Sequence, residues 1–171
     1  MKKTTFNDNG VFIPPFKGLK SKFWHLATSY KNTEFIIENQ LNLCRSMFHN
    51  RGQNLENLDY DKNSLMKFKN KYNMVNGYFP EVNLSLAFYM SKSLNESEKY
   101  IHKLNKEHTG SNKPYVVIPT CPNHFYDLIH EYQENFNIDE FILYDLGKDN
   151  AEKIQNVQII SELFHLKKTV A

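Results

Sequence analysis

The chain has 171 residues, 40% of them hydrophobic, which is enough for one buried core but too little for two domains of ordinary size. Its 21 basic and 19 acidic residues give a formal net charge of +2, so charge permits a nucleic-acid partner without indicating one. Two cysteines are too few for a disulfide framework, and no apolar stretch approaches the ~18 residues of a membrane helix. We therefore expect no membrane partner and a cytoplasmic protein, or one delivered into a host cytoplasm without a conventional signal peptide.

Breakers divide the first half of the chain. Asn9-Gly10 and Pro14-Pro15 predict an N-terminal arm over residues 1–20, which leaves residues 21–171 as a single domain. The domain is expected to begin with a strand at 22–27, a short helix capped by Thr33 and a second strand at 41–44. A polar loop over 49–63 then precedes a helix that carries Leu65, Met66 and Phe68 and stops before Asn76-Gly77.

The second half predicts a further mixture of helices and strands. Asn83 is interpreted as the cap of a helix whose apolar face is Leu84, Ala87 and Phe88, and a second helix is expected from Glu96 to Leu104. Strands are expected at 115–119, 140–144 and 157–164, with a helix after Asn123. These elements show no βαβ rhythm, so the pattern favours the α+β class.

Two negative expectations narrow the chemistry. None of the six glycines stands in a G-x-G or Walker arrangement, which excludes a phosphate cradle of the dinucleotide-fold or P-loop kind. Cys121, His124 and His130 are close in sequence, but one cysteine beside a helical histidine is a weak zinc pattern, and we expect no metal site.

Three short segments carry residue types suited to a nicotinamide nucleotide. His25 lies in the first predicted strand, Tyr78 follows Gly77, and Glu140 opens the apolar run 141–144. A tyrosine ring attracts a cationic pyridinium, and a carboxylate at the entrance of an apolar strand needs solvent or a partner. Each segment alone is equally typical of ordinary structure: a half-buried histidine, a core tyrosine and a solvated glutamate.

In order and spacing, the three segments resemble the catalytic domain of the ADP-ribosyltransferases of the poly(ADP-ribose) polymerase and diphtheria toxin type, over roughly residues 22–166. The second segment continues with Ala87 and Tyr89, nine and eleven residues after Tyr78, and the third reads Glu140-Phe-Ile-Leu-Tyr-Asp145. The resemblance implies an α+β ADP-ribosyltransferase-like fold, with two small packed mixed sheets, flanking helices and an NAD+ cleft between them.

The same resemblance implies an activity and a set of site residues. The chain would be a transferase of the glycosyltransferase class, with NAD+ as its substrate. It would cleave the bond between nicotinamide and ribose and transfer ADP-ribose to an unknown acceptor, either a protein or a nucleic acid, as toxins and polymerase-like enzymes do. Glu140, His25 and Tyr78 would be catalytic. NAD+ would be held by His25, Leu26, Thr28, Tyr78, Tyr89 and Ser85, with the two tyrosine rings clamping the nicotinamide.

Two departures from the family pattern leave alternatives open. Leu26 stands where the family has Gly, and Leu86 replaces a Ser whose hydroxyl holds the carboxamide, with Ser85 next to it. The chain is therefore also interpreted as a catalytically inactive binding module of the same fold, or as an unrelated small α+β interaction protein.

Overall fold

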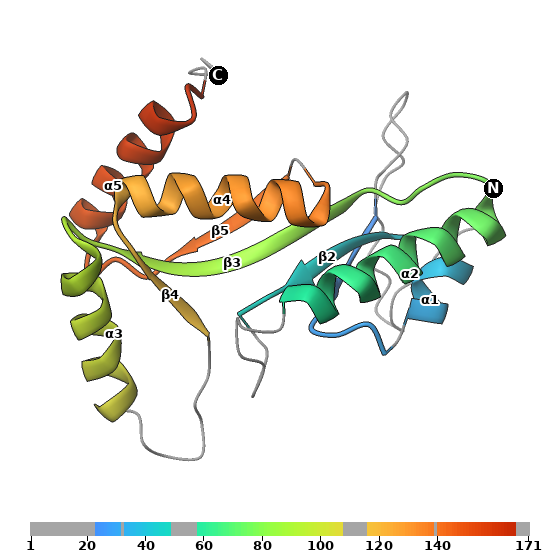
Figure 1. Ribbon diagram of the computed structural model, residues 1–171, viewed down its shortest axis with the longest axis horizontal. Coiled ribbons are helices and arrows are strands. Elements are labelled where there is room, and N and C mark those ends of the chain that lie inside the picture. Colours follow the sequence, from blue (N-terminus) through green and yellow to red (C-terminus); the bar gives the residue numbers. More distant parts are fainter. Residues whose placement is uncertain (1–22, 32, 49–57, 108–115, 139, 167–171) are drawn as a thin grey trace, which may run out of the picture.

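Strands and helices alternate strictly along the chain (Figure 1). The computed structural model describes residues 23–31, 33–48, 58–107, 116–138 and 140–166. The elements are β1 (Trp24–Ala27), α1 (Thr33–Glu38), β2 (Asn42–Ser46), α2 (Leu58–Asn76), β3 (Val82–Met90), α3 (Leu94–Glu107), β4 (Val117–Thr120), α4 (Pro122–Phe136), β5 (Phe141–Asp145) and α5 (Asn150–Leu163). The expectation that the chain lacks a βαβ rhythm is therefore wrong.

The strands form one five-stranded sheet in which every pairing is parallel. β1 pairs with β2, and β2 pairs with the first half of β3; β3 also pairs with β4 and β5. Each helical connection returns the chain to the end of the sheet at which the previous strand began, and consecutive strands are therefore parallel. The predicted mixture of strands and flanking helices is confirmed, but one parallel sheet replaces the two packed mixed sheets that the resemblance implied.

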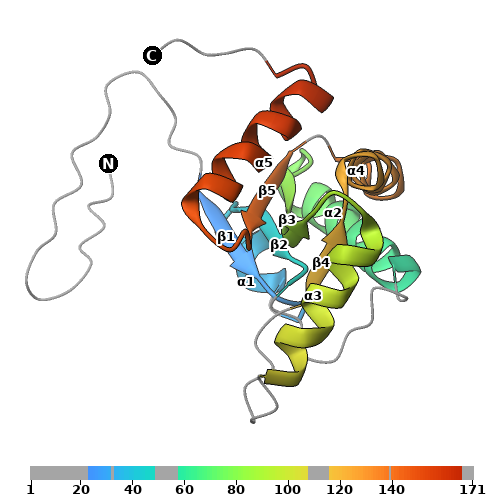
Figure 2. The same ribbon diagram turned by 90° about the vertical axis from the view of Figure 1, so that its left-hand side faces the viewer.

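The core lies on one face of the sheet, and the helices pack around the strands (Figures 1 and 2). All nine residues of β3 are buried, and Val82, Leu84, Leu86, Phe88 and Met90 alternate along it. Successive side chains of a strand point to opposite faces, so these five share the core face and the odd-numbered residues share the other. α1, α2, α4 and α5 all contribute side chains to this one cluster.

Two element predictions are wrong. Residues 83–90, expected to form a helix after Asn83, belong to β3 because three other strands pair with them. Residues 157–163, expected in a strand, belong to α5, whose first turn is fixed when the Asp149 carboxylate accepts a hydrogen bond from the Glu152 N–H at 2.8 Å. The other predicted strands and helices are present with small shifts of their ends.

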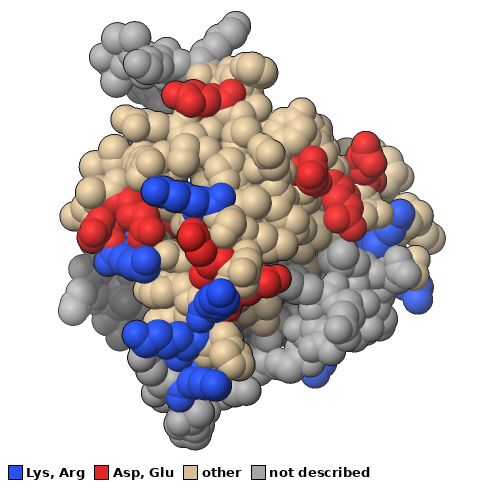
Figure 3. Space-filling view, turned by 60° about the vertical axis from the view of Figure 1, so that its left-hand side comes forward, with Lys and Arg blue, Asp and Glu red and all other residues tan. Residues whose placement is uncertain are grey.

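Lys and Arg are interspersed with Asp and Glu on the face shown in Figure 3. Within the described ranges, no helix is both long and apolar enough to cross a bilayer, and His, Cys, Asp and Glu do not gather in threes that could hold a metal ion. The predicted arm and residues 49–57 of the predicted loop lie outside these ranges, whereas residues 58–63 of that loop are wrong as a loop, because they form the first turns of α2.

Candidate functional site

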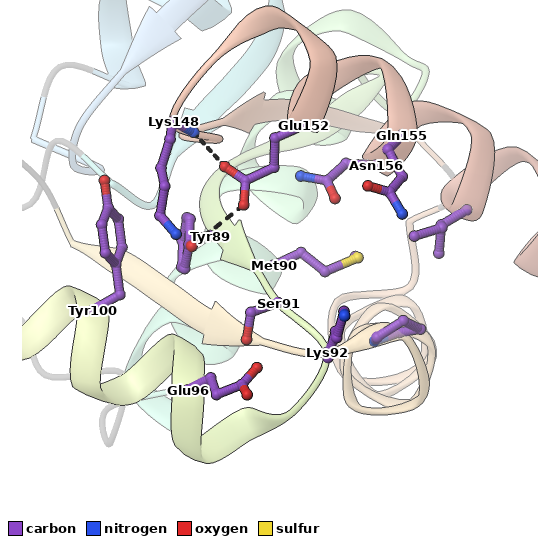
Figure 4. A pocket seen from close by; sticks show the side chains of 12 residues that line it. Tyr89, Met90, Ser91, Lys92, Glu96, Tyr100, Lys148, Glu152, Gln155 and Asn156 are labelled. Atoms are coloured by element: carbon purple, nitrogen blue, oxygen red, sulfur yellow. Dashed lines mark hydrogen bonds between the residues drawn. The ribbon is translucent and has the colours of Figure 1, made fainter.

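A pocket of about 510 Å³ opens at the carboxyl ends of the strands, and we call it the carboxyl-end pocket (Figure 4). It is formed where β3 leads into α3, where α4 begins, and where β5 leads into α5. Because the strands are parallel, these connections all leave the sheet at the carboxyl ends of the strands, which is the usual place for a ligand in folds of this kind. The lining residues are Tyr89, Met90, Ser91, Lys92, Glu96, Tyr100, Pro122, Lys148, Glu152, Gln155, Asn156 and Ile159.

Two tyrosines and a lysine form one side of this pocket. The rings of Tyr89 and Tyr100 stack with centroids 4.1 Å apart and planes inclined by 29°. The Lys148 ammonium lies 5.5 Å from the Tyr89 centroid and 4.9 Å from the Tyr100 centroid, so it sits beside the pair and is attracted by both rings. Tyr89 is buried in β3, whereas Tyr100 on α3 is half-buried and Lys148 is exposed.

Glu152 links this group to the first turn of α5. Its carboxylate accepts a hydrogen bond from the Tyr89 hydroxyl at 3.4 Å and another from the Lys148 backbone N–H (Figure 4). Burial raises the pKa of the Tyr89 hydroxyl, and the nearby Glu152 charge acts in the same direction. The Tyr89 hydroxyl in turn raises the pKa of the Lys148 ammonium. At neutral pH the pocket therefore presents a protonated phenol and a lysine cation.

The turn that carries Lys148 is held by Asp145 at the end of β5. The Asp145 carboxylate accepts from the Gly147 N–H at 2.8 Å and from the Asn156 amide at 3.0 and 3.2 Å. Asn156 is itself buried in α5, so the strand end, the turn and the helix are fixed to one another. This arrangement gives Lys148 and Glu152 defined positions before any ligand binds.

The first motif does not lie in this pocket. His25 lies on the same face of β1 as the core residue Ala27. Its ring packs against that of Phe35 on α1, with the ring centroids 5.6 Å apart. Leu26 points to the opposite face and is 56% exposed, so it crowds no buried pocket. Thr28 follows the strand and is exposed.

The predicted tyrosine clamp is wrong, because the residues between Tyr78 and Tyr89 form a strand and not a helix. Tyr78 precedes β3 and contacts the Tyr72 ring on α2, with its hydroxyl 3.1 Å from that of Tyr72. Tyr89 lies near the far end of β3, and at about 3.3 Å per residue the strand separates the two by roughly 20 Å. One nicotinamide cannot lie between them.

The predicted strand of the third motif is present as β5, and Glu140 directly precedes it. Glu140 is exposed, and its backbone carbonyl accepts from the Leu84 N–H at 3.2 Å. The pKa of the Cys44 thiol on β2 is raised mainly by burial and, to a smaller extent, by the charge of Glu140. Cys44 pairs with Leu26 and Asn83, on the face opposite His25. His25 and Glu140 therefore face opposite sides of the sheet.

Ser85 and Leu86 also lie on opposite faces. Ser85 is buried beside Ser46 in the register of β2 and β3, whereas Leu86 is fully buried in the core cluster. Leu86 is thus a core residue and not a displaced amide contact.

The sequence analysis missed Tyr100, Lys148 and Glu152. One local signal was available for them: Asp149 followed three residues later by Glu152 is a helix-start pattern, which would have placed α5 at the end of β5. Their convergence with Tyr89 depends on the parallel order of the strands and has no local signal.

Comparisons with known proteins agree with the fold and go no further. No protein-family model and no curated protein matches the chain. It is similar to the crystal structure of apo-MsnO8, with a TM-score of 0.65 and 11% identity over 94% of this chain and 56% of that one. It is also similar to the monooxygenase RslO1 from Streptomyces bottropensis, with a TM-score of 0.56 and 9% identity over 84% and 47% of the two chains. The chain spans about half the length of each, and at such identities the likeness shows the fold alone.

Proposed function

We propose that this chain binds a small organic molecule in the carboxyl-end pocket, as part of an oxidoreductase of the monooxygenase kind. The observation that carries the proposal is the pocket itself, in which a stacked tyrosine pair, a lysine and apolar side chains converge where parallel strands end. Support for the reaction class comes from the fold shared with RslO1, which is named a monooxygenase.

The side chains suit binding and orientation of an organic substrate. A monooxygenase places one atom of dioxygen in its substrate and reduces the other to water with two electrons from a reductant. The Tyr89 hydroxyl donates its proton to Glu152 and would offer the ligand an acceptor oxygen, and Lys148 would attract negative charge on the ligand. Met90 and Ile159 would pack against its apolar body.

A fragment screen by two-dimensional NMR on the full chain tests this proposal. Ligands should shift the amide signals of pocket residues such as Lys92 and Lys148. Gln155→Trp should abolish these shifts by filling the pocket, whereas Gln158→Trp, an exposed change on the same helix outside the pocket, should leave them intact. Equal behaviour of the two variants would refute the assignment, as would the absence of any pocket ligand. Ligand-dependent oxygen consumption with a panel of biological reductants then distinguishes an oxidising enzyme from a binding protein.

ADP-ribosyl transfer from NAD+ is a second proposal, supported by Glu140 directly before β5 and His25 within β1, the positions that the resemblance implies. It needs an NAD+ site other than the predicted cleft, because these two residues face opposite sides of the sheet. An acceptor protein or nucleic acid and a cytoplasmic setting belong to this proposal.

Nicotinamide release from NAD+ in a single turnover tests the second proposal. Glu140→Gln should slow release by about 10²-fold, because it removes the charge that stabilises a positive transition state, with little change in melting temperature. Glu81→Gln is the matched control, since Glu81 also stands directly before a strand, β3. Release at the wild-type rate from Glu140→Gln, or none from the wild type, would dismiss the proposal.

A further inference from the structure

The charges around the carboxyl-end pocket are not equally available to a ligand. Glu152 already accepts hydrogen bonds from the Tyr89 hydroxyl and the Lys148 backbone, and Glu96 lies in the first turn of α3, where the helix dipole stabilises a carboxylate. Among the described residues, neither the Lys148 nor the Lys92 ammonium forms a close ion pair, although the Tyr89 hydroxyl and the Glu152 charge both stabilise the Lys148 cation. The pocket therefore offers two cations, while its two carboxylates are stabilised by their own surroundings.

The Lys148 ammonium can reach an anion at little cost. It lies 4.9 and 5.5 Å from the centroids of two aromatic rings, an attraction that is weak at an exposed site, and the Tyr89 hydroxyl and the Glu152 charge also stabilise the cation. Its backbone is fixed through Glu152, so the side chain starts from a defined position and only its outer bonds need to rotate. A carboxylate beside Lys148 would replace a weak cation–π contact with a charge-assisted hydrogen bond.

The other surfaces of the pocket favour a flat, apolar body. The Tyr89–Tyr100 pair forms an aromatic wall beside Lys148, and Met90, Pro122 and Ile159 supply apolar surface to the same cavity (Figure 4). An aromatic ring gains more from such a wall than a saturated ring of the same size, because its edges and faces complement those of the tyrosines. A volume of about 510 Å³ accommodates one or two fused rings.

From this arrangement we infer that the ligand class of the pocket is an aromatic carboxylic acid, with its ring against Tyr89 and Tyr100 and its carboxylate on Lys148. The inference rests on the proposed function and names the chemistry of the molecule bound there.

The probes are 2-naphthoate, its neutral amide 2-naphthamide and the saturated decahydro-2-naphthoate, titrated calorimetrically or by NMR at low salt. Wild-type protein should bind naphthoate at least about fivefold tighter than either analogue. Lys148→Met keeps the length of the side chain without its charge, and should remove most of the preference for the acid over the amide. Lys153→Met, a change outside the pocket on α5, should retain that preference. Raising the salt to 0.5 M should weaken only the acids.

Three results would overturn the inference: no naphthoate binding, equal affinities for acid and amide, or an unchanged preference in Lys148→Met. If naphthoate fails while other fragments still shift the pocket signals, the ligand class is wrong and the proposed function stands. If no fragment binds there, both fail.

Discussion

Leu86 and Leu26 provide a direct test of the sheet, because the resemblance placed both beside a nicotinamide and the structure places them on opposite faces. Leu86 is fully buried at the centre of β3, where β5 pairs with it along one edge and the core cluster surrounds its side chain, which leaves little room for collapse. Leu86→Ala should therefore lower the free energy of unfolding by about 3–5 kcal/mol, from lost burial and the remaining cavity. Leu26 is 56% exposed, so Leu26→Ala should cost only about 1 kcal/mol.

Urea unfolding at equilibrium measures both variants, with fluorescence from Trp24, the single tryptophan, and circular dichroism as independent probes. The denaturation midpoint of Leu86→Ala should fall far below that of Leu26→Ala, with a similar slope. Comparable losses in the two variants would refute the assignment of Leu86 to the core. A gain in NAD+ affinity from Leu86→Ser at undiminished stability would instead favour the ADP-ribosyltransferase alignment.

Three further predictions concern the thiols and the turn before α5. Iodoacetamide at pH 8 should label the partly exposed Cys121 at least about tenfold faster than Cys44. Burial hides the Cys44 thiol and raises its pKa, which lowers the fraction present as thiolate. Peptide mass spectrometry measures the two labelling rates, and equal rates would contradict the burial of Cys44. Asp149→Ala should lower the free energy of unfolding by about 0.5–2 kcal/mol through loss of the cap, as measured by urea titration, and an unchanged midpoint would argue against the cap. Gly147→Ala should shift the NMR signals of the pocket and lower the melting temperature, since its Cβ would lie 3.0 Å from Lys153 Cγ and 3.3 Å from Asp145 Oδ1; an unperturbed spectrum would show that the turn relaxes freely.

Local sequence patterns were enough to predict those elements whose apolar residues fit only one spacing, either that of a helix or that of a strand. The apolar stripes of α3 and α4 indicated helices, although α4 is capped at Cys121 and not at Asn123, and the short apolar runs of β4 and β5 indicated strands. Residues 82–90 fit both periods: Leu84, Ala87 and Phe88 have helical spacing, while Val82, Leu84, Leu86, Phe88 and Met90 alternate. The strand prevails because pairing on both edges satisfies its backbone hydrogen bonds while its apolar side chains share one core.

What the sequence determined by itself was therefore local: most helices and strands, an apolar content sufficient for one core, and a nearly balanced charge. The parallel order of the strands, and with it the meeting of Tyr89, Tyr100, Lys148 and Glu152, was decided only by the tertiary structure. Motif spacing could not reveal this, because side chains close in sequence alternate between the two faces of a strand, whereas segments far apart meet where parallel strands end.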